Sequence, residues 1–165
     1  MTSDNSSLFI PTTYTISEHI LPSEIPNSNM INTILLDKIK KQIGNKCIQL
    51  GYVDKDSIKF IKRSIGKINA THFNGTIHFN VQISMDLCIP KINDIVTAKV
   101  IGKNQAGILC QVHPLQIMLS PENQGGKKVY ESIEKDDTIR LKILRYKIMR
   151  DYDHIRILGK FVEKI

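Results

Sequence analysis

Basic side chains are the residues of this sequence with the most evident capacity for chemistry. They recur at short intervals in two predicted strands near the C-terminal end, and two more flank an earlier loop. The residues that we predict to contact phosphate groups are Lys99, Lys103, Lys142, Arg145, Lys147 and Lys160, and Arg140, Arg150 and Arg156 lie among them. Such contacts give a salt-dependent affinity that is blind to nucleotide sequence. Alternating charge is also the usual pattern of a solvated strand face, so both interpretations stay open.

Residues for catalysis or metal binding show no comparable pattern. The sequence lacks a phosphate-binding loop, a nucleophile elbow, a zinc-binding histidine pair and carboxylates paired at a catalytic spacing. Cys47, Cys88 and Cys110 are far apart, which favours buried thiols in a reducing compartment over a disulfide framework or a metal site. We therefore expect a protein that is not an enzyme and that has no metal and no cofactor.

The net charge of +7 is unevenly distributed along the chain. Residues 1–37 contain four acidic and no basic residues, whereas the remainder contains 23 basic and 12 acidic residues. A basic body is typical of proteins that bind a polyanion or an acidic protein surface. An AT-rich coding sequence, which raises the number of lysines, would give the same charge without any function. No apolar run is long enough to span a bilayer and no secretory signal is recognisable, so we expect an intracellular protein.

The first half predicts a small α+β domain. Residues 1–13 are polar and are expected to be flexible, and 13–20 alternates as a strand does. Apolar residues at helical spacing predict a helix over 30–43, with Gly44 as a left-handed cap. Asn74-Gly75 lies between two apolar runs and predicts a tight type I′ hairpin.

The second half is predicted to be all β. The expected strands are 94–101, 108–112, 115–119, 138–149 and 154–162. After Ile143 the alternation shifts by one residue, to Leu144, Tyr146 and Ile148, which predicts a β-bulge. Five strands with a long polar connection between the third and fourth follow the order of an OB fold. The predicted architecture is an N-terminal α/β domain over 14–90 and a five-stranded antiparallel barrel over 91–165.

The opening of this second half resembles the ribosomal S-one type of OB fold. The positions that carry the resemblance are Asp94, Val96, Ala98, Val100 and Gly107. In that family the outward position after the glycine is commonly aromatic, and the third strand often presents a histidine. Here those positions hold Leu109 and Met118, which removes the usual platform for stacking bases. These two side chains are also candidates for a protein-contact patch.

The order of both halves resembles the stalk family of DNA-directed RNA polymerase, which comprises the seventh subunit of the eukaryotic polymerase and its archaeal counterpart. A strand, a helix, a glycine-containing turn, a hairpin and an apolar run that ends in Pro90 precede the barrel. Residues 85–90 match the family's junction, and Gly66, Gly75 and 77–81 match its glycine and apolar series. The shortened sequence, rich in Ile, Lys and Asn, suits a divergent copy from a large DNA virus.

The resemblance implies a non-catalytic subunit of the polymerase. The first half would dock on the core subunits and pair with a small helical partner, and the barrel would lie near exiting RNA or initiation factors. The protein would then work with the transcription machinery, in the nucleus or in a viral factory or virion. For docking we name an apolar tip made of Ile58, Ile61 and Ile65, beside Gly66. Ordinary core packing is the alternative for these residues.

A second interpretation is a stand-alone OB-fold regulator that binds RNA or mimics a translation factor. It would need only the barrel, and it gives the first half of the chain no role.

Overall fold

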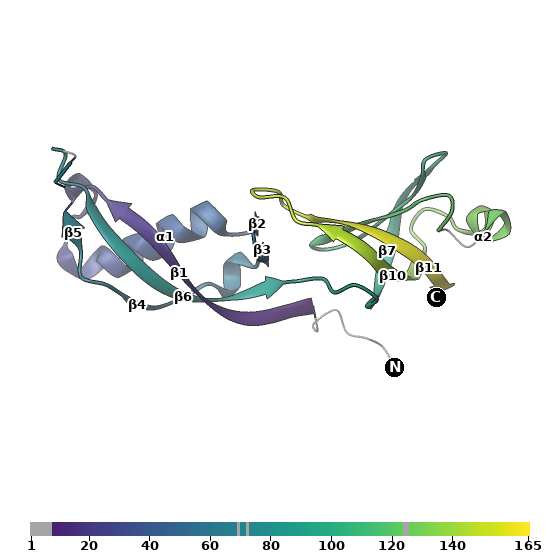
Figure 1. Cartoon of the computed structure of the whole chain (residues 1–165), viewed down its shortest axis with the longest axis horizontal. Coiled ribbons are helices and arrows are strands. Elements are labelled where there is room, and N and C mark those ends of the chain that lie inside the picture. Colours follow the sequence, from purple (N-terminus) through teal and green to yellow (C-terminus); the bar gives the residue numbers. More distant parts are fainter. Residues whose placement is uncertain (1–7, 69, 72, 124–125) are drawn as a thin grey trace. The chain divides into compact units, whose positions relative to one another are not determined.

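The chain folds into two compact units that are not consecutive halves of the sequence. The computed structural model describes residues 8–68, 70–71, 73–123 and 126–165 (Figure 1). One unit, here the sheet-and-helix unit, comprises residues 11–45 and 53–87. The other, here the barrel unit, comprises the described residues of 8–10, 46–52 and 88–165. Short segments of the first half therefore belong with the barrel.

The first sheet has six strands and is accompanied by the main helix of an α+β fold. Its elements are β1 (Phe9–Ile20), α1 (Ile31–Ile43), β2 (Cys47–Ile48), β3 (Gly51–Val53), β4 (Lys59–Arg63), β5 (Lys67–Ile68) and β6 (Ile77–Cys88). The strand order is β1-β6-β3-β2, and β4 and β5 also pair with β6. Strand β1 begins at Phe9, within the stretch expected to be flexible, and residues 1–7 of that stretch lie outside the described residues.

Helix α1 matches its predicted bounds to within one residue. A 3-10 turn at Ser28–Met30 precedes it, and the Asn27 side chain accepts a hydrogen bond from the Asn29 amide at 3.1 Å. The helix buries Leu35, Ile39 and Ile43, which share one face at helical spacing. The expected left-handed cap at Gly44 is wrong, because Gly44 has a φ of −65° and the left-handed residue is Asn45, with a φ of 55°. In the described parts of the chain, no helix is long and apolar enough to cross a membrane.

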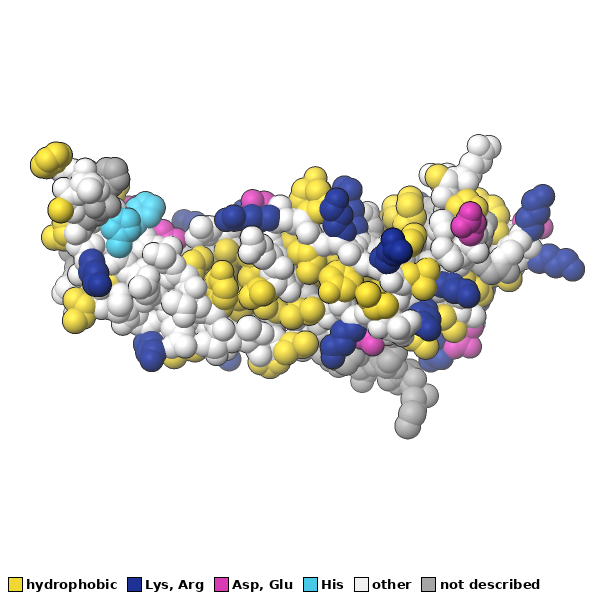
Figure 2. Space-filling model, in the orientation of Figure 1, with side chains coloured by type: hydrophobic (Ala, Val, Ile, Leu, Met, Phe, Trp, Pro, Cys, Tyr) yellow, Lys and Arg dark blue, Asp and Glu magenta, His cyan; other side chains and the backbone are white. Residues whose placement is uncertain are grey.

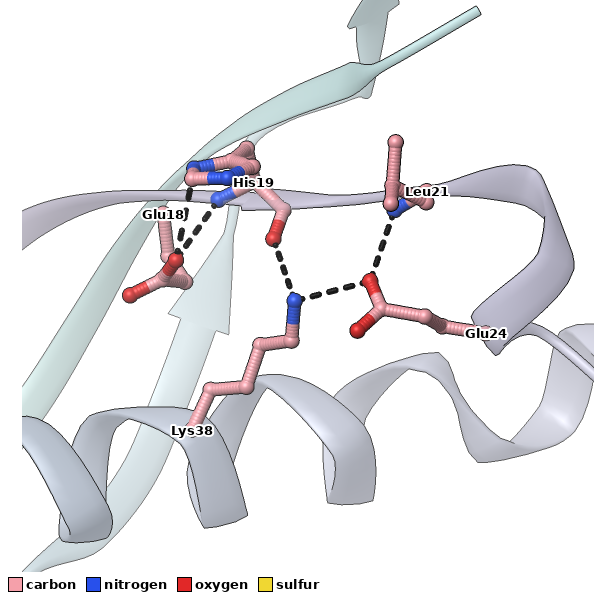
Figure 3. A network of polar contacts seen from close by, with 5 residues as sticks. All are labelled: Glu18, His19, Leu21, Glu24 and Lys38. Carbon is pink, nitrogen blue, oxygen red and sulfur yellow. Dashed lines mark hydrogen bonds and ion pairs between the residues drawn. The ribbon is translucent and has the colours of Figure 1, made fainter. Parts of the chain in front are cut away.

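A polar network fixes α1 to the end of β1. The Lys38 ammonium donates to the His19 carbonyl at 3.0 Å and to the Glu24 carboxylate at 2.8 Å (Figure 3). Glu24 also accepts from the Leu21 amide at 2.8 Å. The hydrogen bond from Lys38, followed by that from Leu21, holds the pKa of Glu24 below its ordinary value.

The turn at Asn74-Gly75 differs from the predicted hairpin. The pairing of Ile68 with Ile77 leaves a longer connection between β5 and β6, so a two-residue type I′ turn is excluded. The Asn74 side-chain oxygen accepts from both the amide and the hydroxyl of Thr76, at 3.1 and 2.5 Å. These local hydrogen bonds stabilise the turn without direct pairing of the strands beside it. Gly75 adopts a positive φ of 69° in the same turn.

The barrel has five strands near the predicted bounds, closed in the order β10-β11-β9-β8-β7. They are β7 (Ile95–Asn104), β8 (Gly107–Val112), β9 (Leu115–Leu119), β10 (Thr138–Lys147) and β11 (Ile155–Lys164). The expectation of a fully antiparallel barrel is wrong, because β11 pairs with β9 in parallel. A connection from β9 to β10 allows this pairing, and it includes a short helix that the sequence did not predict, α2 (Lys127–Ser132). The closed order is that of an OB-like barrel.

The predicted bulge is present in β10. The register with β11 shifts between Ile143 and Arg145, and again between Arg140 and Leu141. Strand β10 pairs with β7 only from Thr138 to Lys142, so its later residues pair with β11 alone. The end of the β10–β11 hairpin therefore extends past the point where the barrel closes.

The barrel core is aliphatic and draws on distant parts of the chain. Buried side chains from all five strands form the cluster, and Cys47, Tyr52 and Cys88 belong to it. The Tyr52 hydroxyl lies 3.0 Å from His113 Nε2, so its buried polar group has a partner. Gly107 is required where β8 begins, because its φ is 139° and a Cβ there would lie 2.0 Å from the Leu119 carbonyl oxygen.

Candidate functional site

A row of neighbouring residues crosses the outer face of the barrel. The strand registers pair Gly102 with Leu109, Leu109 with Met118, and Met118 with Leu158. Arg145 on β10 then pairs with Leu158. Side chains directly opposite each other on adjacent strands share one face of a sheet. Leu109, Met118 and Leu158 therefore form a continuous aliphatic row, which ends at a guanidinium.

This row forms part of a pocket of about 620 Å³, here the barrel pocket. The described residues that line it are Leu109, Gln116, Met118, Arg145, Tyr146, Lys147, Arg156, Ile157 and Leu158. Three of these side chains are basic and none is acidic. A second row of pocket residues also follows from the register, since Arg156 pairs with both Gln116 and Lys147. The pocket thus has an aliphatic floor and a cationic margin.

The structure brings together four of the six predicted phosphate-contacting residues. Arg145 and Lys147 line the barrel pocket, and Lys142 and Lys160 are cross-strand partners farther along β10 and β11. Figure 2 shows Lys and Arg side chains standing among apolar side chains over the barrel strands. A basic surface of this kind can contact phosphate or carboxylate groups.

The other two predicted residues have partners within the barrel unit. The Lys99 ammonium lies 2.8 Å from the Asp136 carboxylate, and this hydrogen bond holds the pKa of Asp136 below its ordinary value. The Lys103 ammonium donates to the carbonyls of Tyr130 and Ile133, and it lies 4.2 Å from the centre of the Tyr130 ring. Lys103 therefore fixes the end of α2, which explains its presence without a ligand.

Tyr146 is an aromatic side chain that is more exposed than the sequence pattern predicted. The phase shift in the sequence placed it inward, but it is 40% exposed and lines the barrel pocket. This part of β10 pairs with β11 alone, so Tyr146 has a neighbouring strand on one side only. Nearby, the guanidinium of Arg156 lies 5.4 Å from the centre of the Tyr152 ring.

The pairing of Leu158 with Met118 across parallel strands could not be inferred from sequence spacing.

The predicted apolar tip is divided by the structure. Ile58 is 2% exposed, so for this residue the core alternative is correct, whereas Ile61 and Ile65 are exposed at 46% and 87%. Close packing explains why residue 66 is Gly66, because a Cβ there would lie 2.5 Å from the Ile77 side chain and 2.8 Å from the Phe79 ring. Its presence does not require a partner.

Two further apolar residues, which the sequence pattern did not single out, extend this exposed region. Ile68 and Phe73 are largely exposed and follow Ile65 closely along the chain. We call these three residues the exposed apolar segment. Figure 2 shows hydrophobic side chains at the end of the unit where Figure 1 labels β5. Single exposed apolar residues are ordinary, but a group in one short stretch is typical of an interaction site.

The thiols and histidines form no second site in the described part of the chain. Cys47, Cys88 and Cys110 are free and buried, and burial raises their pKa to about 11, 12 and 12. Such thiols stay protonated at neutral pH and are poor nucleophiles. No group of three metal-ligating side chains occurs among the described residues.

Comparison of the chain with models of known protein families and with curated protein sequences gives no match.

Proposed function

We propose that this chain is a non-catalytic subunit of a multisubunit DNA-directed RNA polymerase. In this proposal the sheet-and-helix unit docks on the polymerase, and the barrel is an OB fold that is presented to exiting RNA or to initiation factors. The observation that carries the proposal is the strand order of the closed barrel, together with the strand, helix and sheet that precede it. That sequence of elements is the one on which the stalk resemblance rests.

Docking is assigned to the exposed apolar segment. Ile65, Ile68 and Phe73 have little packing within the sheet-and-helix unit, so burying them against a partner removes apolar surface from water. A full interface needs more area than three side chains supply, and a larger contact would surround them. Ile61 on β4 is also exposed, at 46%, and would belong to the same contact.

Contact with RNA is assigned to Lys142, Arg145, Lys147 and Lys160. These side chains lie on adjacent strands, and none of them forms an ion pair with an acidic side chain among the described residues. Without an aromatic platform on β8 and β9, the expected binding is salt-dependent and independent of sequence. A filter-binding titration with single-stranded RNA would measure it, and the absence of binding at low salt would leave the barrel with protein contacts only.

The stand-alone regulator is less consistent with the division of the chain. Cys47 and Tyr52 come from the first half and belong to the barrel core, so residues 91–165 alone would lack part of that core. Point substitutions in the full chain therefore separate the two functions better than a barrel fragment does.

Affinity purification of the tagged full-length chain from its cells of origin tests the proposal. We expect the two largest polymerase subunits among the co-purifying chains. Their absence would contradict the polymerase assignment and would favour the stand-alone regulator.

A further inference from the structure

We propose that the barrel pocket binds a short peptide segment of a partner protein, in which one or two large apolar side chains are flanked by acidic residues. The inference goes beyond polymerase membership, because it concerns the chemistry of the pocket, and it implies that the peptide and RNA compete for Arg145 and Lys147. Its starting point is the aliphatic row of Leu109, Met118 and Leu158, which crosses β8, β9 and β11.

The floor of the pocket favours apolar side chains over bases. Base recognition on an OB face depends on flat aromatic surfaces, and the three central positions here are aliphatic. Met118 is 43% exposed, and an unbranched thioether adapts to partners of different shape. Tyr146 is the one aromatic residue among the described residues that line the pocket, and it lies on β10 at the margin. A single aromatic side chain can pack beside a Leu or Phe of a peptide as well as under a base.

The margin of the pocket favours acidic groups. Arg145, Lys147 and Arg156 lie on adjacent strands at one end of the row, and no Asp or Glu is among the described residues that line the pocket. Guanidinium groups bind carboxylates in a bidentate manner, which fixes orientation as well as adding affinity. An acidic residue beside the apolar anchor would therefore complement this end of the row.

The dimensions fit a short segment. Four adjacent strands carry the row and its terminal guanidinium, and neighbouring strands lie roughly 4.8 Å apart, so the row spans roughly 14 Å. An extended peptide covers that length with about four or five residues. Strands β8, β9 and β11, which carry the aliphatic row, each have a strand neighbour on both sides, so they offer no free edge for a β-strand to extend and side chains would carry the recognition there.

Selection from a displayed library of random peptides on the full chain tests the inference whatever the partner is. We expect enrichment of peptides with Leu, Met or Phe beside Asp or Glu. Synthetic enriched peptides carrying a fluorophore should then bind with an anisotropy change that weakens as salt is raised. Met118→Glu should weaken this binding about tenfold or more, and so should the double substitution Arg145→Glu and Lys147→Glu.

Matched controls are available on the same barrel unit. Ile95 is exposed to a similar extent as Met118 but does not line the pocket, so Ile95→Glu should leave peptide affinity unchanged. Lys127→Glu with Lys128→Glu gives the same charge change on α2 and serves as the control for the basic pair. Thermal unfolding of each variant shows that it is folded.

Three results would overturn the inference. The selection could enrich no common pattern, it could enrich basic peptides, or the enriched peptides could bind Met118→Glu as well as the wild type. A uridine oligonucleotide provides the remaining comparison. If it loses affinity with Met118→Glu while no peptide family depends on that residue, the pocket is a site for single-stranded RNA.

Discussion

The exposed apolar segment and the barrel pocket present apolar side chains in opposite ways. Ile65, Ile68 and Phe73 project from a short stretch of chain because little packs around them. Leu109 and Met118 instead lie in a concave face whose neighbours are fixed by strand register. A projecting segment is suited to entering a partner, whereas a pocket is suited to receiving one. This difference suggests two separate contacts, which can be disrupted independently.

The largest expected effect tests the framework of the pocket. Gly107→Ala places a Cβ against the Leu119 carbonyl at a backbone φ that alanine rarely adopts, so we expect a loss of about 3 kcal/mol or more in the free energy of unfolding. Gly102 is the matched control, because a Cβ there meets nothing within 4 Å. Gly102→Ala should leave stability unchanged or raise it by up to about 1 kcal/mol. Urea denaturation compares the two, and equal effects would contradict the close approach at Gly107.

Tyr52 tests whether the barrel depends on the first half of the chain. The side chain is 3% exposed within the barrel core, so Tyr52→Ala should cost about 3–5 kcal/mol. Hydrogen exchange of the β8 and β9 amides would show whether the loss falls on the barrel. Unchanged protection of those amides would mean that the barrel core is self-contained.

Ile58 and Ile65 form a matched pair in the sheet-and-helix unit. Ile58→Ala should cost about 2–5 kcal/mol because it leaves a cavity, whereas Ile65→Ala should change stability by less than about 0.5 kcal/mol. Denaturation midpoints measure both values. A large loss at Ile65 would show that it packs within the protein and is not free for a partner.

The smallest expected effect is a pH dependence at Asp137. This carboxylate accepts from the Glu134 amide at 2.7 Å, and Lys164 lies 2.6 Å away, and these two contacts lower its pKa in the folded state. The stabilisation is present above the pKa of the unfolded chain and is lost as the pH falls through the lowered value. The difference in melting temperature between wild type and Asp137→Asn should therefore shrink below about pH 4. A difference that is constant down to pH 2 would contradict this assignment.

The barrel was largely predictable because its strands alternate in the sequence. Their bounds and the bulge after Ile143 follow from local periodicity, which directly reflects which side chains are inward. The parallel pairing of β9 and β11 depends on how distant strands close, and alternation carries no information on partner direction. Leu109 and Met118 were predicted as a candidate contact patch, but Leu158 was missed for the same reason, since it meets Met118 only through that pairing.

The sheet-and-helix unit was less predictable because contacts that the sequence pattern does not show determine its turns and its burial. Asn74-Gly75 is the usual signal of a tight hairpin, but the Asn74 side chain bonds to Thr76 and the connection is longer. Ile58 and Ile65 have the same side chain and similar neighbours in sequence, yet only one is buried. Residue type cannot distinguish the two isoleucines, because the burial of each depends on which other residues of the unit pack against it.

The most direct test of the polymerase assignment is quantitative affinity purification of three full-length forms from the cells of origin. These are the wild type, a variant with Ile65, Ile68 and Phe73 each changed to Ser, and Met118→Glu. We predict that the large polymerase subunits co-purify with the wild type and with Met118→Glu, and that their recovery is lost with the triple variant. Recovery of the wild type without any large polymerase subunit would contradict the assignment.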